Sequence, residues 1–226
     1  MNNNKGILIV IDSLDGSGKE TQTTLLAEYL YNIGVDYHLA SFPNYNSPSS
    51  HGVKKLLAGD FPDNNHFASS LLFTYDRMLS MNDKRVNGED VYTLKEFYEN
   101  GGVIICDRYT SSNILYQSIG LEADESVKEY IDWMDDLEYG KLGLPRPDRI
   151  LFLDVPPITA IDNIRKRNKG FDTYENVDKL TKVYEGAKRL KRVGYDMTFI
   201  ECTEYGKMKS IDEIHQLIIK ELEDLL

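Results

Sequence analysis

The hydrophobic pattern of the chain starts with a short, uninterrupted apolar run. Residues Ile7–Ile11 are all apolar and mostly β-branched, which is typical of a strand buried on both faces of a parallel sheet. Comparable runs recur along the chain, and together they predict strands over 7–11, 37–40, 103–106, 150–155 and 197–202. Both faces of such a sheet must be covered by other elements.

Helical patterns alternate with these runs. The clearest helix follows the first strand, and Gly34 sits where its left-handed C-terminal cap belongs. Its apolar face consists of Leu25, Leu26, Tyr29, Leu30 and Ile33. Further helices are expected over 67–81, 93–100, 125–138, 158–167, 177–192 and 211–225. This alternation predicts right-handed βαβ crossovers and an α/β fold, a doubly wound parallel sheet of about five strands flanked by helices.

The domain organisation follows from length and from the breaks between elements. A chain of 226 residues suits one large domain. The polar or Gly/Pro-rich breaks at 42–52, 59–66, 140–148 and 168–174 do not have the composition of interdomain linkers. We therefore expect a single domain over residues 1–226, with ligands bound by the loops at the carboxyl ends of the strands.

Charge restricts the ligands that this domain can hold. The chain has 26 Lys+Arg against 37 Asp+Glu, a formal net charge of −11. Bulk electrostatics therefore argue against a nucleic-acid polymer or an anionic membrane as partner. Any anionic ligand must be bound by donors concentrated in one place.

The cysteines and the first residues indicate the compartment. Cys106 and Cys202 each end an apolar run, so we expect both to be buried as small hydrophobic side chains. Neither these cysteines nor the four histidines have metal-ligand spacing. The N-terminus has no signal-peptide pattern and no apolar stretch reaches about 18 residues. A soluble, cytoplasmic protein is expected.

A glycine-containing turn lies between the first strand and the first helix. Such a turn aims several backbone N–H groups and the positive end of a helix at one point, and Lys19 adds an ammonium group. The segment departs from G-x-x-x-x-G-K-[ST] because Ser13 replaces the first Gly and Glu20 the hydroxyl residue. The alternative interpretation is an ordinary strand–helix turn that happens to have this sequence. We expect nucleotide phosphates to be bound by this phosphate loop (13–20) and the next residue: Ser13, Leu14, Asp15, Gly16, Ser17, Gly18, Lys19, Glu20 and Thr21.

Four more segments lie at strand ends or between strands. They are Phe42-Pro43-Asn44-Tyr45, the helical 73–77 with Phe73 and Arg77, the run 107–117 and Leu153-Asp154-Val155-Pro156-Pro157. With the phosphate loop they resemble thymidylate kinases, from the first strand to the C-terminal helix. The D-R-Y-x-x-S-x-x-x-Y-Q spacing in 107–117 is the most specific element. The resemblance implies a P-loop NTPase-type fold and transfer of the ATP γ-phosphoryl group to dTMP with Mg²⁺.

The resemblance also assigns roles to individual residues. By spacing alone, Phe73 and Arg77 share a helical face and are read as a core ring and a solvated cation; the resemblance implies that they stack on and read thymine. Arg108 would hold the acceptor phosphate, Asp107 the Mg²⁺, and Glu20 a metal-bound water or only solvent. The implied dTMP site comprises Asp15 at the sugar 3′-hydroxyl, Phe42, Tyr45, Phe73, Arg77, Arg108, Ser112, Asn113, Tyr116 and Gln117.

The densest basic cluster is Arg165–Lys169, just before 170–175. On its own it fits a solvated helix end, as does a second cluster over 188–192. Because the phosphate loop has no Arg, the chain resembles thymidylate kinases with lid arginines. A short lid at about 165–176 is implied, with Arg165 or Arg167 catalytic and the choice left open.

The expected reaction needs few catalytic groups, and three other functions remain open. A nucleoside monophosphate needs no general base, since its phosphate is largely ionised near pH 7, so positioning and charge neutralisation suffice. A kinase for another monophosphate or for a deoxynucleoside would keep the fold and Lys19, and the departures at Ser13 and Glu20 suggest a nonenzymatic nucleotide-binding module. Asn44 stands where the family often has Arg. The resemblance further implies a homodimer.

Overall fold

A five-stranded parallel sheet forms the centre of the molecule. The computed structural model describes residues 5–61, 65–87, 90–167 and 174–226. The strand order is β2 (Tyr37–Ser41), β5 (Val103–Asp107), β1 (Ile7–Ser13), β6 (Arg149–Asp154) and β7 (Thr198–Glu201). All four neighbouring pairs are parallel. The predicted α/β fold is therefore confirmed, and each strand overlaps its predicted range.

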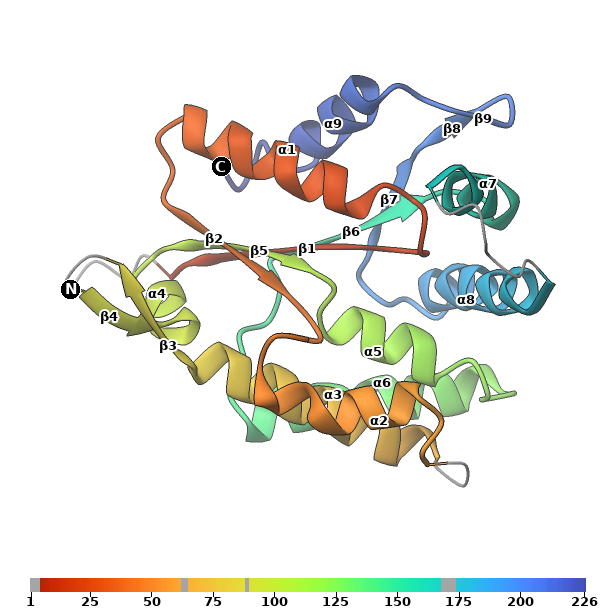
Figure 1. Ribbon diagram of the computed structural model, residues 1–226, viewed down its shortest axis with the longest axis horizontal. Helices are drawn as coiled ribbons and strands as arrows, with labels where there is room; N and C mark the ends of the chain where they lie inside the picture. Colours follow the sequence, from red (N-terminus) through yellow and green to blue (C-terminus); the bar gives the residue numbers. More distant parts are fainter. Residues whose placement is uncertain (1–4, 62–64, 88–89, 168–173) are drawn as a thin grey trace.

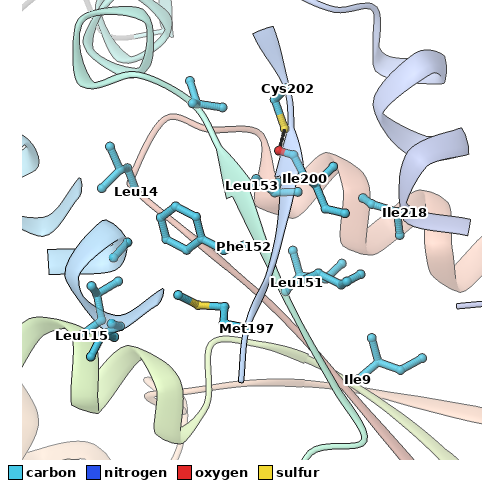
Figure 2. Close-up of a cluster of buried hydrophobic side chains, with 14 of the residues drawn as sticks. Ile9, Leu14, Leu115, Leu151, Phe152, Leu153, Met197, Ile200, Cys202 and Ile218 are labelled. Carbon is cyan, nitrogen blue, oxygen red and sulfur yellow. Dashed lines mark hydrogen bonds between the residues drawn. The ribbon is translucent and has the colours of Figure 1, made fainter. Parts of the chain in front are cut away.

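The inner strands are buried on both faces, as their uninterrupted apolar runs predicted. In β1, Ile9 and Ile11 join one hydrophobic cluster, while Leu8 and Val10 join the other. In β6, Leu151 and Phe152 both belong to the first cluster, and Figure 2 shows Leu151 on the side of Ile218 and Phe152 on the side of Leu115. Cys106 and Cys202 are free and buried, as expected.

Helices cover both faces of the sheet (Figure 1). One face carries α1 (Lys19–Asn32) and α9 (Ile211–Lys220). The other carries α3 (His66–Asn82), α5 (Thr110–Gln117) and α6 (Asp124–Asp135), with α2 (His51–Leu57) against α3. The remaining elements are η1 (Pro48–Ser50), α4 (Leu94–Glu99), η2 (Asp136–Lys141), α7 (Pro157–Arg167) and α8 (Tyr174–Arg192). Among the described residues no helix is long and apolar enough to cross a bilayer.

Several helix ends differ from the expected ones for identifiable reasons. Gly34 has φ 76° and ends α1 as expected, but Ile33 is the C-cap and is exposed, so it does not belong to the buried face. Beyond Asp135 the sixth helix continues as the π-helical segment η2. The last helix ends at Lys220 instead of 225.

Two small hairpins and two short helices were not predicted. The hairpins are β3 (Lys84–Asn87) with β4 (Asp90–Thr93), and β8 (Thr203–Glu204) with β9 (Lys207–Met208). The helices are α2 and α5. All four are short and rich in polar residues, so they lack the apolar periodicity that marks the larger elements.

Candidate nucleotide-binding site

The phosphate loop is shaped by two glycines in left-handed conformation. Gly16 has φ 81° and Gly18 has φ 87°. A Cβ on Gly16 would lie 2.4 Å from the carbonyl oxygen of Ala160, so this glycine also permits close contact with α7. The Asn163 amide donates to the Gly16 carbonyl at 3.0 Å and fixes α7 against the loop.

Gly18 is the N-cap of α1 and provides no side-chain cap. The first N–H groups of the helix are therefore available to an anion, and the helix dipole favours one there. Ser17 adds a buried hydroxyl that has no hydrogen-bond partner among the described residues. Both features suit phosphate oxygens.

Lys19 starts α1 with its side chain nearly buried. Its ammonium donates to the Leu14 carbonyl at 3.1 Å and lies 3.5 Å from the Ser13 carbonyl and 3.9 Å from an Asp15 carboxylate oxygen. Burial lowers the pKa of Lys19 to about 8, and the neighbouring Arg108 charge acts in the same direction. A bound phosphate would add negative charge beside this ammonium.

The two departures from the phosphate-loop pattern have different surroundings. Ser13 is buried at the end of β1, and its hydroxyl donates to the Leu14 carbonyl at 2.9 Å. Its backbone is not left-handed, so the position does not require glycine. Glu20 is exposed in the first turn of α1, and Thr21 is half-buried beside it.

Arg108 lies beside this loop, at the end of β5. It is one of two described non-glycine residues with positive φ, at 67°, a strained conformation of the kind that occurs at functional sites. Its guanidinium donates to Asp15 at 2.6 Å and to the Ser112 and Tyr116 hydroxyls at 3.3 Å. The structure thus brings together four of the predicted residues.

Asp12 is a buried carboxylate that sequence reasoning did not single out. It accepts hydrogen bonds from the Ser111 and Ser112 hydroxyls at 2.8 Å and 2.7 Å and lies 3.8 Å from the Arg108 guanidinium. It therefore connects the end of β1 to the first turn of α5. A carboxylate inside an otherwise apolar strand was the available signal.

Asp107 is the candidate metal ligand. Its Oδ1 atom is buried without a hydrogen-bond partner among the described residues. Burial raises the pKa of Asp107, while the Lys19 and Arg108 charges oppose that rise. No group of three or more described His, Cys, Asp or Glu residues could hold a metal by itself. One free carboxylate oxygen beside a phosphate cradle still fits Mg²⁺, which needs few protein ligands when substrate phosphates complete its shell.

The predicted base-reading pair has an unexpected setting. Phe73 is half-buried on α3, whereas Arg77 is fully buried, so it is not the solvated cation that spacing alone suggested. The Arg77 guanidinium forms a bidentate ion pair with Glu138 at 2.8 and 2.9 Å. Burial opposes the charge of Glu138, but Arg77 and two threonine hydroxyls hold the pKa of its carboxyl below the usual range.

The remaining predicted substrate residues differ in burial and contacts. Asn113 is buried on α5, where its amide nitrogen donates to the Ser70 carbonyl at 3.1 Å and its Oδ1 has no described partner. Tyr45 is exposed, and Gln117 is half-buried. Phe42 is buried in the core, and its ring lies 5.7 Å from the guanidinium carbon of Arg77.

The loop before α2 is anchored by a further residue that the sequence did not reveal. The buried Asp76 carboxylate accepts from the Asn44 backbone N–H at 2.8 Å and from the Ser49 hydroxyl at 2.5 Å. Asn44 is thereby part of the connection between β2 and α3. Asp76 follows Tyr75 on the helix that also carries Phe73 and Arg77.

The predicted lid lies only partly within the described residues. Arg165 is exposed on α7 and is 3.4 Å from Asp162. Residues 168–173 and the side chain of Arg167 lie outside the described residues. The second basic cluster, by contrast, is not simply solvated: Lys188 pairs with Asp154 at 2.5 Å and Arg189 with Asp124 at 2.7 Å.

The phosphate loop, Asp107 and Arg108 lie at one edge of the sheet. Ser13 ends β1, and Asp107 ends β5, so the cradle and the charged residues meet at the carboxyl ends of parallel strands. A glycine-containing loop, a helix N-terminus and a buried lysine at that edge define a P-loop nucleotide-binding α/β protein.

Comparison with known proteins specifies the class further. The family model described as thymidylate kinase matches residues 11–218. A thymidylate kinase of Plasmodium falciparum is 31% identical over 218 residues, covering 96% of this chain and 90% of that protein. A probable thymidylate kinase of Thermococcus kodakarensis is 29% identical, covering 97% and 98%, and a thymidylate kinase of Desulfotalea psychrophila is 28% identical, covering 100% and 98%. The chain belongs to the thymidylate kinase family.

Proposed function

We propose that this protein is a thymidylate kinase, which transfers the γ-phosphoryl group of ATP to dTMP and yields dTDP and ADP. The observation that carries the proposal is the placement of two sites on one sheet edge. The phosphate loop with Lys19 forms the first, and Arg108 with the α3–α5 residues forms the second. A donor and an acceptor phosphate can then meet between Lys19 and Arg108.

The side-chain donors and acceptors of the second site match a thymine base. Asn113 Oδ1 is a buried acceptor without a described partner, and Arg77 is a buried cationic donor. Thymine offers an N3–H donor and an O4 acceptor, which complement these two groups. Cytosine offers an acceptor at N3 and an amino donor at C4, so both contacts would be mismatched. Phe73, half-buried on the same helix, provides a ring for stacking.

The sugar and acceptor phosphate would lie toward Arg108. Asp15 is 66% exposed although it pairs with Arg108, so it can accept a hydrogen bond from a sugar hydroxyl. Tyr116, whose hydroxyl accepts a hydrogen bond from Arg108 at 3.3 Å, would crowd a ribose 2′-hydroxyl. Arg108 itself would bind the acceptor phosphate in bidentate fashion.

Transfer would proceed by alignment and charge neutralisation. Lys19 and the α1 N-terminus hold the donor phosphates, and Arg108 holds the attacking phosphate in line with them. Asp107 would hold Mg²⁺, which neutralises phosphate charge when bound. Arg165 or Arg167 would supply the remaining positive charge from the lid, and closure of the lid would exclude water.

We also infer a homodimer in the cytoplasm. The exposed apolar side chains Phe67, Leu71 and Tyr75 recur every four residues along α3. The only Asp or Arg side chains of this helix, Asp76 and Arg77, are both buried. An uncharged apolar strip lets two copies, each with a net charge of −11, approach closely. Two free, buried cysteines fit a reducing compartment.

Sedimentation tests the dimer. Leu71→Glu should yield monomers, because it places a carboxylate in the centre of the strip. Tyr31→Glu is the matched control, since Tyr31 is an exposed aromatic residue on α1, across the sheet from α3. A Leu71→Glu protein that sediments as wild type does would exclude this interface.

An ADP-formation assay with ATP, Mg²⁺ and a panel of acceptors tests the activity. We expect turnover with dTMP and strong loss in Lys19→Ala. Preference for another monophosphate or for a deoxynucleoside would favour the alternative kinases. Nucleotide binding without transfer to any acceptor would favour a nonenzymatic module and contradict the proposal.

A further inference from the structure

Glu138 is a fully buried carboxylate that no sequence pattern marked. It lies in the π-helical segment η2, a rare backbone geometry that is common at functional sites. Its two oxygens accept four hydrogen bonds: from Arg77 Nε at 2.9 Å, Arg77 Nη2 at 2.8 Å, Thr74 at 2.6 Å and Thr110 at 2.5 Å. The π-turn therefore brings one carboxylate into the contact between α3 and α5, which lie on the same side of the sheet (Figure 1).

The guanidinium of Arg77 is held on three sides. The Glu138 carboxylate accepts hydrogen bonds from Nε and Nη2 along one edge of the guanidinium. The rings of Phe42 and Tyr109 lie 5.7 Å and 5.2 Å from the guanidinium carbon. No described residue takes a hydrogen bond from Nη1, so its donors point away from the clamp in a fixed direction.

We propose that Glu138 is the positioning residue that fixes Arg77 as the donor to the base carbonyl; this rests on the proposed function, in which Arg77 reads the pyrimidine. A free arginine could swing aside when the base presents an amino group at C4. A clamped arginine cannot, so cytosine leaves a buried donor unpaired and is rejected. Glu138 thus contributes to base selectivity without touching the substrate.

A purely structural ion pair between η2 and α3 is the competing explanation. Both explanations predict lower stability when Glu138 is changed, because an unpaired buried charge is costly. Only the positioning role predicts a change in base selectivity. Stability therefore does not discriminate, and kinetics with two nucleotides does.

The experiment compares Glu138→Gln with wild type, using dTMP and dCMP as acceptors. Glutamine keeps the volume but places an amide N–H₂ against one of the Arg77 donors. We expect KM for dTMP to rise about tenfold, kcat at saturation to stay within about threefold, and the dTMP/dCMP ratio of kcat/KM to fall about tenfold. Asp135→Asn is the matched control: it breaks the neighbouring 2.6 Å pair with Arg146 and should leave all three quantities unchanged.

A double-mutant cycle with Arg77→Met tests whether Glu138 acts through Arg77. In the Arg77→Met background, Glu138→Gln should change KM no further. An unchanged selectivity ratio in folded Glu138→Gln, or fully additive effects in the cycle, would overturn the proposal.

A second variant and the wild-type protein separate failure to fold and failure of the proposed function from failure of the positioning role. If Glu138→Gln does not fold, Glu138→Asp serves instead, because it keeps the charge pair but withdraws the carboxylate; a KM for dTMP equal to that of wild type would refute the positioning role. Failure of the proposed function is seen separately, as a wild-type protein that does not prefer dTMP to dCMP.

Discussion

The buried ammonium of Lys19 should make ATP binding depend on pH above neutrality. Without ligand, burial and the Arg108 charge lower the pKa of Lys19 to about 8. Only the protonated form offers a full positive charge to phosphate. Phosphate binding should therefore be coupled to protonation of Lys19, and affinity should fall as the pH rises.

The size of the effect follows from the titration curve. With a pKa of about 8, Lys19 is about nine-tenths protonated at pH 7 and about one-tenth protonated at pH 9. If only the ammonium form binds phosphate, Kd for ATP rises about tenfold across this interval. A lysine at its ordinary pKa of about 10.4 would give almost no change over the same range.

Isothermal titration of ATP into the protein at pH 7, 8 and 9 measures this dependence. Lys19→Met is the control, because it removes the titrating group; its affinity should be low and nearly independent of pH. A wild-type Kd that is constant from pH 7 to 9 would refute the lowered pKa of Lys19. A pH dependence that persists in Lys19→Met would refute the assignment of Lys19 to the phosphates.

Three further predictions follow from the same geometry. Gly16→Ala should lower the free energy of unfolding in urea by about 2 kcal/mol or more, because its Cβ meets the Ala160 carbonyl oxygen at 2.4 Å. In Gly18→Ala the Cβ meets nothing within 4 Å, so the free energy of unfolding should fall by only about 1 kcal/mol. Equal losses in the two variants would contradict this explanation. Arg108→Lys should lower kcat/KM for dTMP about 100-fold with little change in Tm, since lysine lacks the bidentate fork, and a wild-type rate would remove Arg108 from the acceptor phosphate. Asp107→Asn should raise the Mg²⁺ concentration needed for half-maximal rate about tenfold, while Glu20→Gln leaves it unchanged; a shift with Glu20→Gln would place that exposed side chain at the metal.

The sheet and the large helices could be predicted from the sequence because their signal is local. The run Ile7–Ile11 is apolar at every position. In the structure it lies in β1, which pairs with a strand on each side and is covered on both faces. By contrast, half of the residues of α5 are Thr, Ser or Asn. The buried hydroxyls of Thr110 and Ser111 donate hydrogen bonds to Glu138 and Asp12, and such pairing has no periodic signature.

The site residues also differ in whether the sequence could reveal them. Arg108 directly follows β5, and Lys19 starts the helix after the loop at the end of β1, so the rule that ligands bind at strand ends could find both. Glu138 stands among several acidic residues of one helical stretch, and nothing in the sequence distinguishes the buried one. Its partner Arg77 is 61 residues away, so the pair appears only when α3 and η2 are placed together.

Direct competition between acceptors tests the central claim most closely. ATP and Mg²⁺ are supplied with equal concentrations of dTMP and dCMP, and the two diphosphates are separated and quantified at early times. We expect dTDP to exceed dCDP by about 100-fold, because the donor at Arg77 and the acceptor at Asn113 match thymine and oppose cytosine. Equal amounts of the two products, or an excess of dCDP, would contradict a thymidylate kinase.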